Sequence, residues 1–274
     1  MAYKRILTIQ DISCVGQCSM TVALPIISAC GHEVCILPSA LLSTHTGGFD
    51  NPAITNLTSS LESIWRHWQR EGITFDAIYT GYLGSIESIR IANQIMDELL
   101  APGGVIIVDP AMADHGKLYR GFDEAYVEQM KALCMRADIM IPNVTEAAMF
   151  AEMPYLDDFD EAYICDLLQK LGGKDIVLTG VGFEPDKTGV AIRVENKFSY
   201  YFHDRIARSY HGTGDMFAAA FTGALMRGKS VYGSVHIAAE YTCQCIRNTF
   251  ESPAHWYGVK FETALPLLID MLNE

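Results

Sequence analysis

Apolar and polar positions alternate in blocks along this chain. Short runs rich in Val, Ile and Leu predict buried strands at 4–10, 33–37, 76–80, 104–109, 138–141 and 174–179. Between most of them, apolar residues recur at helical spacing, which predicts helices over 54–70, 85–100, 122–134 and 159–171. Strands that alternate with helices form parallel sheets, because each parallel connection needs a long crossover. Residues 104–108 are apolar throughout, as a strand covered on both faces requires.

The pattern changes after Thr179. Residues 188–194 and 197–203 predict two paired strands around Glu195-Asn196, since Asn tolerates a left-handed turn. Helices dominate from 214 onward, and no internal repeat or long linker is found in the sequence. We therefore expect one α/β domain over 1–274, with a mostly parallel central sheet flanked by helices on both faces. Residues 38–50 are rich in Ser, Thr and Gly and predict a loop over the substrate.

Composition narrows the class of partner. Of the 274 residues, 50% are hydrophobic and 19% are charged, which excludes a mostly disordered chain. The net charge is −13 and no cluster of Lys and Arg stands out, so we expect a small-molecule partner and no nucleic acid. An anionic substrate would then need local donors, because the overall field repels it.

One segment requires a membrane test. Residues 12–31 contain no Asp, Glu, Lys or Arg, but Gly16, Gln17 and Pro25 interrupt a spanning helix. We therefore predict a buried strand, a turn and a packed helix there, and no membrane partner. The eight cysteines lack C-x-x-C spacing, which favours buried thiols in a reducing cytoplasm over a zinc site.

The sequence His211-Gly212-Thr213-Gly214-Asp215 precedes an Ala-rich apolar run. Two glycines let the backbone turn tightly beside a ligand, and the first amides of a helix favour an anion. Asp215 at that point could take a proton from a hydroxyl while the amides hold a phosphate. The alternative interpretation is a glycine-rich turn with Asp215 as a helix cap.

Further carboxylates follow two predicted strands. Asp109 and Asp114 come after one of them, and Asn143 and Glu146 come after the next. Open α/β sheets bind ligands at the carboxyl ends of their strands, and carboxylates there suit Mg²⁺ with nucleotide phosphates. Taken separately, Asp109 could be a turn former and Glu146 a residue of a first helical turn.

Together these motifs resemble the ribokinase-like superfamily, and within it the pyridoxal kinase family. Gly212-Thr213-Gly214-Asp215 with the Ala-rich helix carries the resemblance to the superfamily. Other segments occur in the family's order over about residues 4–250: Ile9-Gln10 with Gly16, Ser43 to Gly47, Thr80 to Ser85, Asp109 to Met112, and Pro142-Asn143 with Glu146.

The resemblance implies an enzyme that uses ATP and Mg²⁺ to phosphorylate the 5′-hydroxymethyl group of pyridoxal, pyridoxamine or pyridoxine. By matching position, Asp215 would be the general base, and Gly212, Thr213 and Gly214 would form the anion hole. The remaining expected residues form two sets. The residues expected at the nucleotide are Asp114, Asn143, Glu146 and Thr179, of which Asp114 and Glu146 would also bind the metal. The residues expected at the vitamin are Asp11, His45, Thr46 and Tyr82. The resemblance also implies a homodimer.

Asp11 departs from the family's pattern, in which Ser usually occupies this position. A carboxylate there could pair with a protonated pyridine nitrogen. Related hydroxymethylpyrimidine kinases, which act on a thiamin precursor, carry an Asp in their first glycine-containing turn. Two alternatives to a vitamin B6 kinase therefore stay open, namely a hydroxymethylpyrimidine kinase and a non-catalytic B6-binding protein on the same scaffold.

Overall fold

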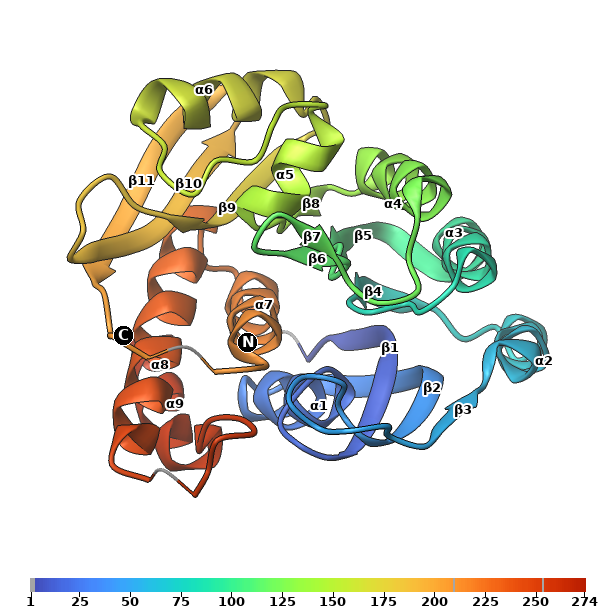
Figure 1. Cartoon of the computed structure of the whole chain (residues 1–274). Helices are drawn as coiled ribbons and strands as arrows, with labels where there is room; N and C mark the ends of the chain where they lie inside the picture. The colour runs from blue at the N-terminus through green and yellow to red at the C-terminus, as the bar shows by residue number, and fades with distance from the viewer. Residues whose placement is uncertain (1–2, 209, 253) are drawn as a thin grey trace. The chain divides into compact units, whose positions relative to one another are not determined.

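The computed structural model describes residues 3–208, 210–252 and 254–274 (Figure 1). By its internal contacts the chain forms two compact units, the first from residues up to 104 together with 206–274, and the second from 105–205. The single domain expected over 1–274 stays a prediction, and each unit is considered separately below.

The sheet of the first unit is built around β1 (Arg5–Val15). This strand pairs in parallel with β2 (Glu33–Thr44) and β4 (Phe75–Thr80), so that Leu7 lies opposite Cys35 on one side and Ile78 on the other. The short β3 (Ile54–Asn56) runs antiparallel to β2. Ile6, Leu7 and Ile9 are fully buried, as a central strand between two helical layers requires.

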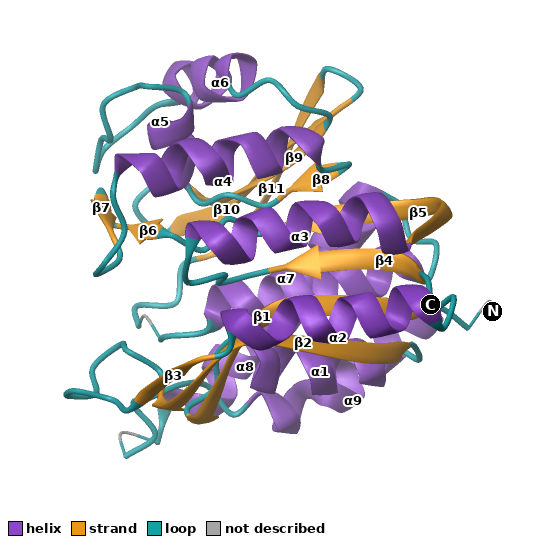
Figure 2. Cartoon of the chain, turned by 90° about the vertical axis from the view of Figure 1, so that its right-hand side faces the viewer, coloured by secondary structure: helices purple, strands orange, loops and turns teal. Residues whose placement is uncertain are grey.

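Helices cover both faces of this sheet. Figure 2 shows α2 (Thr58–Arg70) and α3 (Ile86–Leu99) on one side and α1 (Met20–Ala29) on the other. The first unit also contains α7 (Thr213–Met226), α8 (Val231–Phe250), the 3₁₀ turn Phe261–Ala264 and α9 (Leu265–Asn273). A Cβ at Gly223 of α7 would lie 2.3 Å from the Cys30 Sγ, so glycine allows α7 to pack directly on the end of α1.

The strand β5 (Leu100–Val108) begins in the first unit and ends in the second. It pairs in parallel with β8 (Ile139–Met140), and β8 pairs in parallel with β9 (Asp175–Val181). The predicted hairpin is confirmed as β10 (Lys187–Val194) and β11 (Lys197–Asp204), with Glu195 and Asn196 at φ values of 49° and 61°. The remaining elements of this unit are α4 (Glu124–Arg136), α5 (Val144–Phe150), α6 (Glu161–Lys170) and the small ribbon β6 (Ala113–Asp114) with β7 (Lys117–Leu118).

Three expectations from the sequence are wrong in detail. Residues 38–44 are not loop, because β2 continues to Thr44 and is held by β1 on one side and β3 on the other. The helix predicted over 54–70 begins at Thr58, since 54–56 form β3. All eight cysteines are free, but Cys14 is exposed at the end of β1 and is not a buried thiol.

The membrane question is answered for the part of the chain that the structure covers. None of its helices combines the length and the apolar character that crossing a bilayer requires. Residues 12–31, which raised the question, form the end of β1, a turn and α1.

Arg193 of β10 joins the sheet of the second unit to the end of α6. Its guanidinium is 5% exposed and donates hydrogen bonds to backbone carbonyl oxygens at the end of that helix and in the turn that follows, those of Leu168, Gly172, Gly173 and Lys174. One side chain thus provides donors for carbonyl groups that the helix leaves unpaired at its C-terminus.

We expect Arg193→Met to lower the free energy of unfolding by about 1–3 kcal/mol, because the buried Leu168 carbonyl loses its donor and the turn after α6 loses its link to the sheet. Urea unfolding monitored by circular dichroism measures this. Lys187→Met on the same strand is the control, since Lys187 pairs with the exposed Asp204 and such a pair contributes at most about 1 kcal/mol. Equal effects of the two substitutions would contradict the role assigned to Arg193.

Candidate active site

The glycine turn before α7 has the geometry of an anion site. Gly212 adopts a left-handed conformation at φ 80°, and a Cβ there would lie 1.9 Å from the backbone oxygen of Gln17. No other residue type fits at this position without displacing the loop 16–19. The N–H groups of the first helical turn, from Thr213 to Asp215, have no partner within the helix, and the space around Gly214 is open.

Asp215 lies in this first turn, half-buried, while the N-cap position belongs to Gly212. The alternative interpretation of Asp215 as the helix cap is therefore wrong. Burial, together with the nearby charge of Asp11, raises the pKa of its carboxyl to about 7, against a hydrogen bond from the Ser19 backbone N–H. A carboxyl with a pKa close to neutrality can accept a proton and release it again at physiological pH.

Asp11 lies on β1 where the register with β2 shifts between Gln10 and Ile12. Its side chain is 3% exposed and accepts a hydrogen bond of 3.1 Å from the Ser13 hydroxyl. Burial raises the pKa of Asp11, and hydrogen bonds from the Ser19 and Ser13 hydroxyls act in the opposite direction. The first unit thus brings two carboxylates close enough for the charge of Asp11 to act on Asp215.

Tyr82 belongs to the same group of residues. It follows β4 and is half-buried, and burial together with the charge of Asp11 raises the pKa of its phenol. Its ring lies over Gly84, at 3.3 Å from the position of a Cβ there. Among the residues expected from the sequence, Asp11, Tyr82 and Asp215 are therefore neighbours within the first unit.

His45 has a different environment from the one expected of a ligand contact. Its Nε2 lies 2.7 Å from the backbone oxygen of Tyr257, and its Nδ1 accepts a 3.1 Å hydrogen bond from the Gly47 N–H. Both ring nitrogens are therefore occupied by backbone. Burial lowers the pKa of His45, and the neighbouring His211 ring, 5.3 Å away between centroids, lowers it further.

The loop that starts at His45 borders the glycine turn, because His211 directly precedes Gly212 and a Cβ at Gly47 would lie 2.5 Å from its ring. Thr46 in this loop is exposed. The part of 38–50 that is loop thus lies on the side of the unit that carries Asp215, where a segment covering a substrate is expected.

Ser13, Gln17 and Ser19 are site residues that the sequence did not point to. The Gln17 side chain links the loop 16–19 to the end of the chain, since its Oε1 lies 2.9 Å from the His255 Nε2 and its Nε2 donates to Glu262 at 3.0 Å. Ser19 precedes an apolar helix, a position in which serine normally indicates a cap, so the pattern contained no signal for a second role.

In the second unit, Glu146 is 2% exposed and both of its oxygens accept backbone N–H groups. One oxygen accepts from Met112 at 2.9 Å, and the other from Asn143 at 2.9 Å. The Asn143 side chain accepts in turn from the Glu146 N–H, which completes a capping box at the start of α5. Burial raises the pKa of Glu146 to about 7, against these amide bonds, and the charge of Asp114 adds to the rise.

Asp114 is the expected metal residue with solvent access, since its side chain is 55% exposed. Thr179 lies next to Asn143 across a parallel bridge, and its N–H donates to the Pro142 oxygen at 2.9 Å. Over the described ranges, no group of three or more His, Cys, Asp and Glu side chains could hold a metal ion. These residues suit Mg²⁺ only as an ion that keeps its waters and its phosphate ligands, with one carboxylate from the protein.

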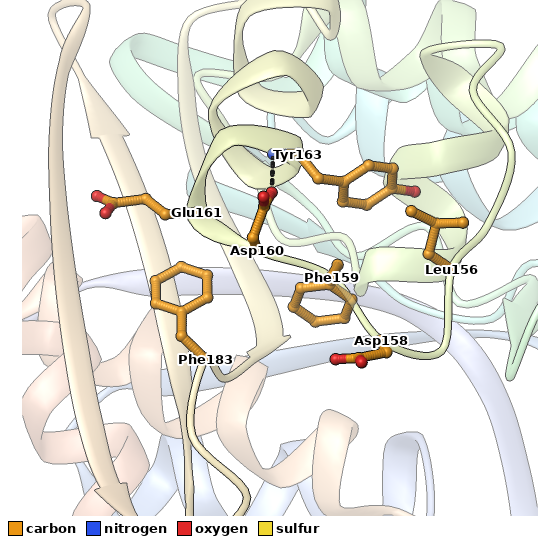
Figure 3. Close-up of a pocket in the computed structure, with 7 residues that line it drawn as sticks. All are labelled: Leu156, Asp158, Phe159, Asp160, Glu161, Tyr163 and Phe183. Carbon is orange, nitrogen blue, oxygen red and sulfur yellow. Dashed lines mark hydrogen bonds between the residues drawn. The ribbon is translucent and has the colours of Figure 1, made fainter.

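A cavity of about 530 Å³ in the second unit contains none of the expected site residues. Figure 3 shows Phe159 and Phe183 facing this space, with Tyr163 at the start of α6 beside it. Asp158, Asp160 and Glu161 also line it, so its charge opposes a nucleotide phosphate. We therefore assign no step of phosphoryl transfer to this cavity.

Comparison with known proteins gives a consistent result. A family model described as phosphomethylpyrimidine kinase matches residues 56–259. A solved structure of a putative phosphomethylpyrimidine kinase from Bacteroides thetaiotaomicron, crystallised with pyridoxal, is 34% identical with a TM-score of 0.92, over 97% of this chain and 96% of that one. The structure of pyridoxal kinase from Lactobacillus plantarum is 32% identical with a TM-score of 0.91, over 98% of both chains.

More distant proteins share the similarity. Pyridoxine kinase from Bacillus subtilis is 28% identical over 188 residues, which span 66% of this chain and 67% of that one. The fold also matches a pyridoxal kinase from Staphylococcus aureus solved with ADP, at 22% identity and a TM-score of 0.79 over 95% of this chain and 94% of that one.

The raised pKa of Asp215 predicts how stability depends on pH. Its carboxyl binds a proton more tightly in the folded chain than in the unfolded one, so its contribution to stability is present at low pH and is lost as the pH rises through about 7. We expect Asp215→Asn, which cannot ionise, to raise the free energy of unfolding by about 1–2 kcal/mol at pH 8 and to change it little at pH 5.

Urea unfolding of wild type and variant at both pH values measures this difference. Asp50→Asn on an exposed loop of the same unit is the control for exchanging a carboxyl for an amide outside the site. A variant that is equally destabilised at both pH values would contradict the charge penalty at Asp215.

Proposed function

Since the chain belongs to the phosphomethylpyrimidine kinase family, we propose that it transfers the γ-phosphate of ATP to the 5′-hydroxymethyl group of a vitamin B6 compound. The family makes the chain a kinase, related to the pyridoxal kinases of the ribokinase-like superfamily. The observation that carries the proposal is Asp215, a half-buried carboxyl with a pKa of about 7 beside the open amides of the glycine turn.

The proposed step uses these groups as base and anion hole. Asp215 accepts the proton of the 5′-hydroxyl group. At the same time, the oxygen of that hydroxyl forms the new bond to the γ-phosphorus. The bond from that phosphorus to the oxygen shared with the β-phosphate breaks, and ADP leaves with the electron pair. The N–H groups of Gly212 to Gly214 stabilise the charge on the transferred group, because a helix N-terminus attracts anions.

Asp11 and Tyr82 would hold the ring of the vitamin. A buried carboxylate can accept a charge-assisted hydrogen bond from a protonated pyridine nitrogen, and this bond offsets the water that both ions lose. Tyr82 beside it offers an aromatic face and a hydroxyl. The loop with Thr46 would cover the substrate and exclude water, with His45 fixing the loop through its two backbone hydrogen bonds.

The second unit would contribute to the nucleotide. Asp114 would be the carboxylate that holds Mg²⁺, and the ion would supply positive charge to the nucleotide phosphates. Glu146 and Asn143 hold the backbone of residues 112–113 through their hydrogen bonds, and so fix the segment that carries Asp114. Thr179, on the strand next to Asn143, would approach the nucleotide. ATP as donor is supported by the ADP complex of the Staphylococcus aureus kinase.

A second candidate is phosphorylation of a hydroxymethylpyrimidine. The description of the family model and the carboxylate of Asp11, which could also bind an aminopyrimidine, favour it. The pyridoxal in the Bacteroides thetaiotaomicron structure and the similarity to the Lactobacillus plantarum pyridoxal kinase support the vitamin B6 assignment. A binding protein without activity would have no use for a base at position 215. The homodimer and the cytoplasmic location stay predictions.

We expect Asp215→Asn to reduce kcat by about 10²- to 10⁴-fold, the usual contribution of a positioned general base. Asn keeps the shape of the side chain but cannot accept the proton. ATP affinity should change little, because backbone amides bind the phosphates. Steady-state kinetics and nucleotide binding on the same purified variant measure both, and a kcat near that of the wild type would show that Asp215 is not the base.

Asp11→Ser separates the two candidate substrates. If Asp11 binds a pyridinium, the variant should raise KM for pyridoxal, pyridoxamine or pyridoxine by about 10- to 100-fold and leave KM for ATP unchanged, since a hydrogen bond to a charged group is worth about 1.5–3 kcal/mol. Turnover of each vitamin and of hydroxymethylpyrimidine by wild type and variant tests this. Faster turnover of the pyrimidine by the wild type would overturn the vitamin B6 assignment.

A further inference from the structure

Gln17 touches the glycine turn with its backbone. Its carbonyl oxygen lies 1.9 Å from the position that a Cβ on Gly212 would take, so the two segments are in direct contact. The carbonyl groups on either side of it, those of Gly16 and Cys18, accept hydrogen bonds from the Thr21 hydroxyl at 3.3 and 2.8 Å. Among these three carbonyl groups, it is that of Gln17 that faces the turn. The position of the Gln17 oxygen therefore limits where Gly212 can lie.

The side chain of Gln17 is held from several directions. Its Nε2 donates to both carboxylate oxygens of Glu262, at 3.0 and 3.2 Å. Because an ionised carboxylate only accepts, this contact turns the amide oxygen toward His255, whose Nε2 donates to it at 2.9 Å. Gly258 packs against the same side chain, since a Cβ there would lie 2.9 Å from the Gln17 Cβ. The amide therefore has one orientation, and residues 238 and 245 positions further along the chain determine it.

The partners of this side chain are themselves anchored. The buried Tyr241 donates a 3.1 Å hydrogen bond from its hydroxyl to the backbone oxygen of Phe261, which directly precedes Glu262. The loop that supplies the histidine donor is held at Tyr257, whose backbone oxygen lies 2.7 Å from the His45 Nε2. The amide is thus fixed between two segments that have their own contacts in the first unit.

We propose that Gln17 is a positioning residue for phosphoryl transfer, whose side chain fixes the loop 16–19 so that its carbonyl oxygen keeps the anion hole at Gly212 in place. The proposal rests on the function proposed above and adds a residue to it. Gln17 touches no reacting atom. It acts through the N–H groups of the glycine turn, and their placement matters because donors stabilise charge in a transition state only when they are already in position.

The test compares Gln17→Ala with Gln69→Ala. Gln69 is the matched control, because it also donates to a surface glutamate of the first unit, Glu98 at 2.7 Å, but from α2 to α3. Gln17→Ala should lower kcat by about 10- to 100-fold, somewhat less than the loss of a whole donor from such a hole, and leave KM for the vitamin within about threefold. Gln69→Ala should keep the wild-type kcat. Both should lower Tm by at most about 4 °C, because each loses a surface hydrogen bond.

A second variant shows whether Gln17 acts through its partners. Glu262→Ala should also lower kcat, and the double variant with Gln17→Ala should be no slower than Gln17→Ala alone, because both substitutions break the same link. Effects on kcat that multiply would overturn the proposal. If Thr21 alone holds the loop, Gln17 is merely structural, and Gln17→Ala would lower Tm but keep the wild-type kcat, which also overturns it.

A wild type that phosphorylates no B6 compound would instead mean that the proposed function fails. Gln17 is then tested by calorimetric titration with ADP and with the ATP analogue AMP-PCP, in the absence of the vitamin. Gln17→Ala should weaken AMP-PCP binding by about 3- to 10-fold and leave ADP binding unchanged, because only AMP-PCP has a γ-phosphate for the anion hole. Equal AMP-PCP affinities of Gln17→Ala and the wild type would overturn the role of Gln17.

Discussion

Two carboxylates in one buried group are the constraint on which the rest of this site depends. Asp11 and Asp215 repel each other, and burial makes the charged form of each more costly. The chain meets this cost with the Ser13 hydroxyl, which donates to Asp11, and with the open helix terminus beside Asp215. Because burial raises the pKa of Asp215 more than its hydrogen-bond donors lower it, this carboxyl can accept a proton near neutral pH. The same imbalance makes the site less stable than an uncharged core would be, which is the usual relation between an activated group and its scaffold.

Glu146 in the second unit shows that a raised carboxyl pKa does not identify a base by itself. Its pKa is also about 7, but its oxygens accept backbone N–H groups from Met112, Ala113 and Asn143, so its bonding capacity is used to hold a loop and to cap α5. Asp215 has one backbone donor and stands beside open space. The difference lies in the partners of the two carboxyls. One carboxylate is therefore a structural element and the other is available for chemistry.

The sequence predicted the order of strands and helices well, because buried parallel strands and amphipathic helices leave periodic apolar patterns. It failed at 38–44, where Ser and Thr suggested a loop but the strand is held by neighbours on both sides, a fact of pairing that no local pattern contains. Through the family resemblance it grouped Asp11, Tyr82 and Asp215, which are neighbours in the first unit, and their roles stay predictions. It did not show that the His45 nitrogens are both taken by backbone, because the Tyr257 oxygen that one of them meets lies 212 residues further along the chain.

The close contact between Gly212 and the Gln17 oxygen has a consequence for synthesis of the chain on the ribosome. The loop 16–19 emerges before residues 105–205 of the second unit, whereas the glycine turn that packs against it emerges after them. Gln17 is also tied to His255 and Glu262, close to the end of the chain. The nascent first unit therefore holds its loop 16–19 without the partners that fit it until residues 212–262 have been made. During that interval the apolar faces that α7 and α8 will later cover need protection from aggregation, and ligand binding at the glycine turn cannot begin.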